Sequence, residues 1–376
     1  MRKLWEKRRG KVQLVLFLLV LVLNLLAWNF SAVSDFYVNY IFPIWVNTYG
    51  RVTGFFPFSV GEVMLLSVLF IITAAVLLLI PAIVFRKRSF GRVMRRIYAG
   101  VLQLILPVCL IMTLNCTMLY HCSKIDIAAD DSVSYDEKDV LSLYNTLMTR
   151  ANELSKIIDR DEDGNAVYSG DIKKKAISSM KAISGVHKRL DGYYPVTKDI
   201  ANSWFLSQQY IAGYYFPFSM ESNINRLMYI VNNPFTVCHE LAHVRGYIYE
   251  DEANFLAFAA CYESGDIFFE YSGCVQVLPY VVEKLNEYRD AGLIAENEIV
   301  KAQKNVLSDS VFLDEKAWEK VKEQSVLNTE TVSKYTEIAM DASLKLNGVK
   351  KGIDSYSDVL MLLLDYFYNN NTVGKK

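Results

Sequence analysis

The stretch VMLLSVLFIITAAVLLLIPAIVF, residues 63–85, contains no charged residue. A helix of that length crosses a hydrocarbon core of roughly 30 Å. Two further runs of similar length also lack charge, VQLVLFLLVLVLNLLAWNFSAV (12–33) and IYAGVLQLILPVCLIMTLNCTMLYH (97–121). A soluble core would not hold three such runs within 121 residues, so the sequence predicts three transmembrane helices. The first run is too long for a signal peptide, and no convincing small-residue cleavage site follows it.

The distribution of Lys and Arg predicts the orientation of these helices. Six basic residues lie in MRKLWEKRRGK (1–11) and six in RKRSFGRVMRR (86–96), whereas residues 34–62 contain only Arg51. Positive residues accumulate on the cytoplasmic side of a membrane. We therefore expect a multi-pass protein of the cytoplasmic membrane with a cytoplasmic N-terminus, an outer loop over 34–62, and an extracytoplasmic C-terminal domain.

Composition changes sharply after the third apolar run. Of 40 Lys and Arg residues 13 precede residue 124, but of 41 Asp and Glu residues only Glu6, Asp35 and Glu62 do. The rest of the chain is therefore acidic, which argues against nucleic acid as a partner. The sequence predicts a membrane domain over 1–123 and an extracytoplasmic domain over 124–376.

The C-terminal domain shows mostly helical periodicity. Apolar residues recur at helical spacing after residue 137, and the pattern after residue 265 is again helical. The aromatic-rich segment 204–230 can include a strand. The expected fold is mainly α: three N-terminal transmembrane helices followed by an α-rich domain with room for a small β-sheet.

The segment PFTVCHELAHVRGYIYEDEANFLAF (234–258) holds two of the four histidines of the chain. Asn233 and Pro234 are typical of a helix start and Gly246 of a helix end, which predicts a helix over 234–245. On it His239 and His243 lie one turn apart on the same face. This HExxH pattern is typical of a Zn²⁺ site in which Glu240 acts as general base on a zinc-bound water.

A catalytic zinc has three protein ligands, and no third histidine follows the motif. The residues EDEANFLAFAACYESG (250–265) predict a second helix, on which Glu250 and Glu252 point about 200° apart. We favour Glu250 as third ligand, with Glu252 as the alternative. Asn254 lies one turn after Glu250 and could hydrogen-bond a ligand histidine. Candidate stabilisers of an oxyanion are Arg245, Tyr247, Tyr249 and Tyr215.

HELAHVRG followed by EDEANFLAF resembles the bacterial membrane proteins grouped as domain of unknown function 3810. The three apolar runs, GYYFPFSMESNIN (213–225) and SYSDVLMLLLDYFY (355–368) extend this resemblance over most of the chain. The family is regarded as zinc metallopeptidases without an agreed substrate. More distantly the motif is similar to the glutamate-zincins, in which a second helix carries a ligand Glu with an Asp four residues on. That similarity implies a zincin-like domain with Glu250 as ligand and Asn254 in the Asp place.

Three functions follow from these residues. The leading hypothesis is a membrane-anchored zinc metallopeptidase that hydrolyses peptide bonds of a peptide or envelope protein outside the cytoplasmic membrane. The alternative is a non-enzymatic, zinc-stabilised binding or sensor domain at the cell envelope. Glu240 argues against it, because a structural zinc needs no base. Hydrolysis of a cell-wall amide or a lipid-linked group is the third.

Overall fold

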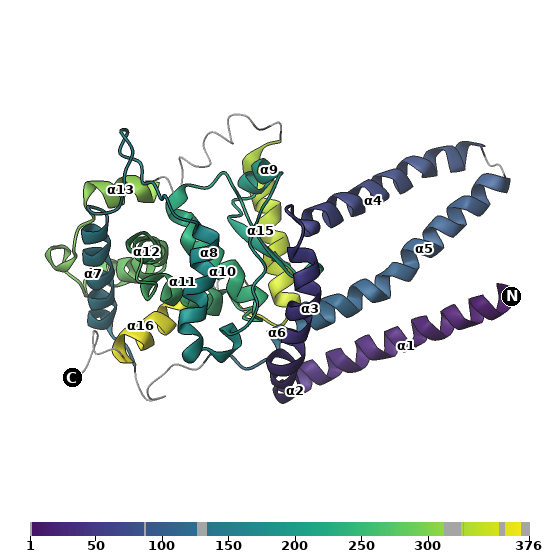
Figure 1. The fold of residues 1–376 in the computed structure, drawn as a ribbon, viewed down its shortest axis with the longest axis horizontal. Helices are drawn as coiled ribbons and strands as arrows, with labels where there is room; N and C mark the ends of the chain where they lie inside the picture. The colour runs from purple at the N-terminus through teal and green to yellow at the C-terminus, as the bar shows by residue number, and fades with distance from the viewer. Residues whose placement is uncertain are drawn as a thin grey trace. The chain divides into compact units, whose positions relative to one another are not determined.

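The computed structural model describes residues 2–85, 88–125, 134–311, 325, 327–352 and 358–369, with only the backbone for 2–9, 79–85, 88–97 and 311. The chain divides into two compact units (Figure 1). The first comprises Met1–Ser123 with Phe216–Glu221, and the second comprises Lys124–Tyr215 with Ser222–Lys376.

Three long helices dominate the first unit: α1 (Arg2–Asn29), α4 (Val60–Phe85) and α5 (Arg88–Met112). The segments Gly10–Asn29, Val60–Leu78 and Tyr98–Tyr120 are long and apolar enough to cross a membrane, and few of their residues are buried. Their apolar side chains therefore face outward, as lipid-facing helices require. The protein is a membrane protein with three candidate spans.

The third span continues beyond α5 through a π-helical turn, η2 (Thr113–Thr117), into the short α6 (Met118–Tyr120). Helix α1 packs against α5. The Asn24 side chain on α1 donates to the Thr113 hydroxyl at 2.8 Å. This pairing satisfies a polar group that the hydrocarbon region could not hydrate.

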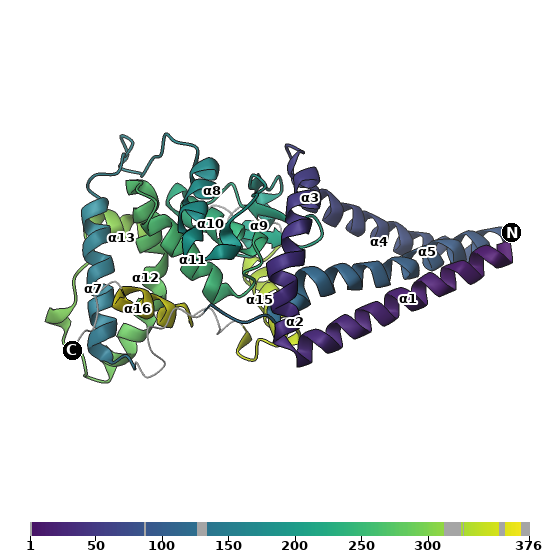
Figure 2. The ribbon, with the colours of Figure 1, turned by 60° about the horizontal axis from the view of Figure 1, so that its bottom comes forward.

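The segment between the first two spans is helical, although the sequence pattern indicated a loop over 34–62. It consists of α2 (Ser31–Phe36), the π-helical η1 (Tyr37–Ile41) and α3 (Phe42–Gly54). Figure 2 shows α3 lying across the ends of the long helices of its unit.

Residues 216–221 belong to the first unit, to which backbone carbonyls and the Glu221 side chain connect them by hydrogen bonds. Tyr49 and Thr53 on α3 donate to the carbonyls of Phe218 and Ser219, at 2.9 and 2.8 Å. The Glu221 carboxylate accepts from the backbone of Gly61 at 2.9 Å and of Val60 at 3.3 Å, in the first turn of α4. The fully buried Glu221 is thereby paired with the positive end of a helix.

The second unit is mainly helical. α7 packs along α12, and α10 and α11 pack against each other and against α12. Its helices are α7 (Glu137–Leu154), α8 (Ile172–Ala182), α9 (Ser203–Gln208), α10 (Asn233–Val244), α11 (Glu250–Tyr262), α12 (Ile267–Asp290), α13 (Lys304–Val311), α15 (Thr329–Leu346) and α16 (Val359–Asn369). Leu241, Ala242, Phe255 and Phe258 are almost fully buried, so α10 and α11 lie inside the core.

A small mixed sheet completes the fold. It contains β1 (Lys198–Asp199), β2 (Gly213–Phe216) and β3 (Glu221–Ile224) in the order β1-β3-β2. β1 runs parallel to β3, with Lys198 opposite Asn223, and β2 forms an edge. The prediction of a mainly α protein with three apolar N-terminal helices and a small sheet is confirmed.

Candidate metal centre

Helix α10 begins at Asn233 and ends at Val244, one residue earlier at each end than the sequence predicted. Asn232 precedes the helix without a side-chain capping bond, and Pro234 occupies the first turn. Gly246 has φ +87° and its amide donates to the His243 carbonyl at 2.9 Å. This left-handed residue, which glycine adopts without strain, turns the chain towards α11.

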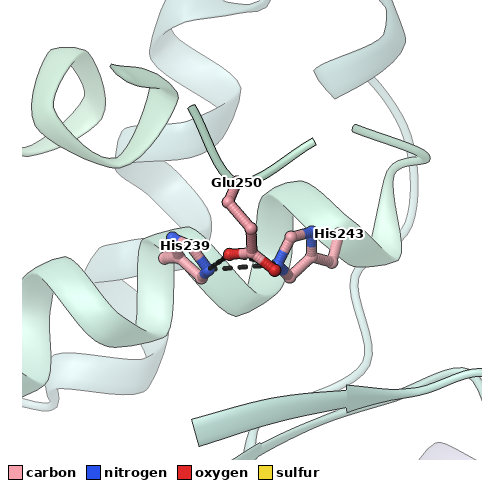
Figure 3. A group of neighbouring side chains, drawn as sticks. All are labelled: His239, His243 and Glu250. Atoms are coloured by element: carbon pink, nitrogen blue, oxygen red, sulfur yellow. Dashed lines mark hydrogen bonds and ion pairs between the residues drawn. The ribbon is translucent and has the colours of Figure 1, made fainter. Parts of the chain in front are cut away.

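Three side chains converge between α10 and α11 (Figure 3). The Nε2 atoms of His239 and His243 lie 3.0 Å apart, and Glu250 Oε2 lies 3.1 Å and 3.7 Å from them. The candidate ligand atoms all lie within 4.8 Å of one another. The first residue of α11 thus brings its carboxylate to the two imidazoles of α10, as Figure 3 shows. Two imidazoles and a carboxylate fit a transition-metal ion.

Hydrogen bonds from neighbouring residues hold the imidazole rings of His243 and His239 in place. His243 Nδ1 lies 2.7 Å from the Tyr247 carbonyl, which can only accept, so Nδ1 donates and Nε2 is left for a ligand. The Asn254 side chain hydrogen-bonds the ring of His239. Asn254 Nδ2 in turn donates to the Tyr280 hydroxyl at 3.2 Å. Such partners fix the orientation of metal-binding histidines.

Burial and charge act together on these groups. Burial alone would raise the pKa of Glu250, but the charge of His243 and hydrogen bonds with both imidazoles hold it well below its usual range. Burial would lower the pKa of His243, but the neighbouring charge of Glu250 outweighs burial and raises this pKa to about 9. Burial lowers the pKa of His239. The centre therefore contains an ionised carboxylate that attracts positive charge.

Glu240 lies on the same helix and is 3% exposed. Burial raises its pKa to about 8, with Glu250 adding to the rise and His243 opposing it. Its Oε2 atom has no hydrogen-bond partner among the described residues. A buried polar oxygen without a partner is costly, and such atoms are often explained by an absent water or ion.

Glu252 does not join the three candidate ligands. It is 1% exposed, and its carboxylate accepts a hydrogen bond from the backbone of Ile125. Burial raises the pKa of Glu252 to about 7. The next acid, Asp251, pairs with Lys124 at 2.7 Å. Of the two acids that the sequence offered as third ligand, the structure brings Glu250 to the histidines.

The four candidate oxyanion stabilisers lie in different surroundings. Tyr215, on β2, has its ring centroid 6.5 Å from that of His243. Arg245 is 5% exposed and donates to the backbone carbonyls of Arg189 and Asp191. Tyr247 and Tyr249 lie beneath the cationic groups of Arg189 and Lys124, at 3.8 and 4.4 Å from the ring centroids. Tyr247 touches His243 through its backbone carbonyl, whereas Tyr215 has its side-chain ring beside the ring of this candidate ligand.

Two residues near the site had not been singled out from the sequence. Tyr280 on α12 supports Asn254, and nothing in its local pattern distinguishes it from the other tyrosines. Gly213 starts β2, and a Cβ atom there would lie 2.8 Å from Glu240 Oε1 and 2.7 Å from the Asn223 carbonyl. Only glycine lets the strand pass this close to Glu240.

Fold and site together define a membrane protein with a candidate His/His/Glu metal centre. The chain belongs to the family described as protein of unknown function (DUF3810), whose model matches residues 37–364. The family resemblance seen in the sequence is thus confirmed, whereas the similarity to glutamate-zincins stays a prediction. No curated protein and no solved structure matches the chain.

Proposed function

We propose that this protein is a membrane-anchored zinc metallopeptidase that cleaves peptides or envelope proteins outside the cytoplasmic membrane. The observation that supports it is the convergence of His239, His243 and Glu250, together with Glu240 on the same helix, whose buried Oε2 has no partner among the described residues. Two histidines and a glutamate are a ligand set of catalytic zinc that leaves a position open. A structural zinc would have a closed set of four ligands and no use for Glu240.

The residues of this chain would divide the work as follows. His239, His243 and Glu250 hold the zinc, which when bound lowers the pKa of water to about 7 and polarises a carbonyl. Glu240 accepts the proton of the attacking water and returns it to the leaving amine. Its pKa of about 8 in the absence of a cation would fall beside one, because a nearby positive charge favours the carboxylate.

The edge strand β2 supports a peptide as substrate. It lies at one side of the sheet, its residues are half-buried, and its first residue, Gly213, approaches Glu240 closely. An extended peptide can add to such an edge through backbone hydrogen bonds. Tyr215 on this strand is the residue we propose as oxyanion stabiliser, because its ring lies next to His243.

The orientation in the membrane is part of the proposal. The two basic clusters flank a nearly uncharged segment 34–62 and favour a second unit on the outer side. An alkaline phosphatase fused after Lys376 should be active, since this reporter requires export. An inactive phosphatase with an active cytoplasmic reporter at the same point would place the site in the cytoplasm and end the extracytoplasmic role.

The decisive variant is Glu240→Gln, which keeps the size of the side chain and removes its ability to accept a proton. Because Glu240 Oε2 has no partner in the described structure, the change should leave zinc content and thermal stability as in the parent. Peptide hydrolysis should fall by about two to four orders of magnitude. Zinc per chain, melting temperature and the inventory of shortened envelope peptides are measured in both proteins.

His239→Ala serves as the matched control, because it should lose both zinc and hydrolysis. The sensor hypothesis expects a different pair of results: Glu240→Gln without effect in any assay and His239→Ala with a destabilised fold. Identical peptide inventories in parent and Glu240→Gln cells, with zinc content intact, would favour the sensor over the peptidase.

A further inference from the structure

The helical segment between the first two spans exposes a band of large apolar side chains. Their exposed fractions run from 43% to 88%. We call this band the apolar face; it comprises Tyr40, Ile44, Trp45, Val52, Phe55 and Phe58. Helix α3, which carries its middle part, is too short to be a span itself. Large exposed apolar patches on a protein mark a surface that something covers.

The other sides of α3 have different chemistry. Val46, Gly50 and Thr53 are buried within the first unit. Asn47 and Arg51 lie one turn apart and are exposed beside the apolar face. Successive residues are about 100° apart, so Asn47 points about 140° from Val52 but only about 60° from Ile44, and Arg51 lies within about 20° of Ile44. The exposed side of α3 is therefore mostly apolar and has one polar edge, formed by Asn47 and Arg51.

The two flanking spans fix the depth of this segment in a bilayer. The candidate span Gly10–Asn29 ends two residues before α2 begins at Ser31. The next span starts at Val60, two residues after Phe58. Both ends of the segment are thus held at the end of a span, where hydrocarbon meets the headgroups. Figure 2 shows α3 running across the long helices of its unit rather than along them.

We infer that the apolar face is a lipid-binding surface, which lies in the interface between the headgroups and the acyl chains. Amphipathic helices lie in this plane with the apolar side buried roughly 5–10 Å. Trp and Tyr rings, such as those of Trp45 and Tyr40, are enriched at that depth. Residues 31–58 include only two charged side chains, Asp35 and Arg51, which suits a surface that must leave water.

The opposite side of α3 connects this lipid contact to the segment between β2 and β3. Tyr49 and Thr53 hold the carbonyls of Phe218 and Ser219, and Asn115 in the third span donates to the carbonyl of Pro217 at 2.6 Å. The connection between β2 and β3 is therefore hydrogen-bonded to α3, which the bilayer surface positions. The depth of this connection in the membrane would be set by the lipid contacts of α3 as well as by the spans.

Spin labels on the full-length protein in vesicles of phosphatidylethanolamine and phosphatidylglycerol test this inference. A nitroxide is attached at Val52→Cys or Trp45→Cys on the apolar face, and at Asn47→Cys as the control on the polar side. The parent chain, whose described cysteines are buried or half-buried, gives the background labelling. Collision with oxygen, which concentrates in lipid, and with a water-soluble nickel chelate then measures the depth of each label.

We expect both apolar-face labels to be accessible to oxygen and protected from nickel, at a shallow depth, with Asn47 accessible to nickel. Nickel access at Val52 and Trp45 would place the face in water and overturn the inference. Protection from both reagents would mean that protein covers it. Dipolar broadening of the nitroxide spectrum would then show that a second copy of this chain covers the face. An unbroadened spectrum would show that another protein covers it. A depth near the bilayer centre would show a buried segment instead, also against the inference.

Discussion

Two clusters of buried polar side chains in the second unit differ in how completely their groups are paired. The Asp309 cluster consists of Arg160, Tyr229, Tyr271 and Asp309. The metal cluster consists of His239, Glu240, His243 and Glu250. The first cluster consists of polar groups paired with one another, and the second is a candidate metal site.

The Asp309 cluster is internally satisfied. Asp309 is 1% exposed, and Arg160 binds it through both terminal nitrogens at 2.8 and 3.3 Å. The hydroxyls of Tyr229 and Tyr271 donate to its two oxygens at 2.9 and 2.6 Å. Charge and hydrogen bonds are balanced, so this cluster needs nothing further.

The metal cluster is not balanced in this way. With His243 Nδ1 donating to Tyr247, its Nε2 faces His239 Nε2 at 3.0 Å and a carboxylate oxygen at 3.7 Å. A proton can occupy this point, as the raised pKa of His243 reflects, and a metal cation could take its place. This exchangeable centre marks the cluster as a candidate metal site, whereas the Asp309 cluster holds its charge with fixed protein partners.

The largest effect should come from removing the carboxylate of the metal cluster. Glu250→Gln keeps the size of the side chain but takes away the charge that faces both imidazoles, so zinc should be lost on dialysis. Glu252→Gln is the matched control, since that carboxylate accepts from Ile125 and faces no imidazole. Zinc per chain is measured by atomic emission on both purified variants.

The reverse result would change the ligand set. If Glu252→Gln lost zinc and Glu250→Gln retained it, the arrangement in Figure 3 would not be the metal-bound one. Retention of zinc in both variants would leave the two histidines as the only necessary ligands and would weaken the comparison between the clusters.

The Asp309 cluster should respond in stability rather than in metal content. Asp309→Ala leaves the Arg160 charge unpaired and should destabilise the second unit by about 3–5 kcal/mol. Tyr271→Phe removes a single hydrogen bond to the carboxylate and should cost about 1.5–3 kcal/mol. Denaturation midpoints in detergent show which of the two variants loses more stability. Zinc per folded chain should match the parent in both.

Loss of zinc from folded Tyr271→Phe would mean that the two clusters are coupled and do not separate into a structural and a ligand-binding class. An Asp309→Ala protein as stable as the parent would show that the buried pair contributes no net stability. Asp309→Asn, which keeps the shape of the side chain, distinguishes lost charge from lost packing.

The two clusters also differ in how far the sequence reveals them. The residues of the metal cluster lie within 12 positions, so helical spacing alone predicts that His239 and His243 share a face. The same spacing favoured Glu250 over Glu252. Arg160 and Asp309 are 149 residues apart, and no periodicity connects them. Their pairing depends on how α13 packs, which only the folded core determines.

Membrane-facing elements show the same limit. The apolar runs predicted the three spans, because length and lack of charge are local properties. The connection over 34–62 was predicted only as an outer loop, and its helical structure over 34–54 was not, since the interrupted apolar pattern there makes sense only beside the ends of two spans. The place of residues 216–221 in the first unit was missed for the same reason, as its contacts reach Tyr49 and Asn115.

Loss of the hydrogen bond that supports the His239 ring should have a weaker effect than loss of a ligand. Asn254 hydrogen-bonds this ring and is itself held by Tyr280. Asn254→Ala should weaken zinc binding about 10–100-fold, the usual worth of such a partner. Tyr280→Phe leaves Asn254 in place without its acceptor and should weaken binding less. Competition with a chelator measures both. If Asn254→Ala bound zinc as the parent does, the orientation of His239 would depend on the zinc and Glu250 alone.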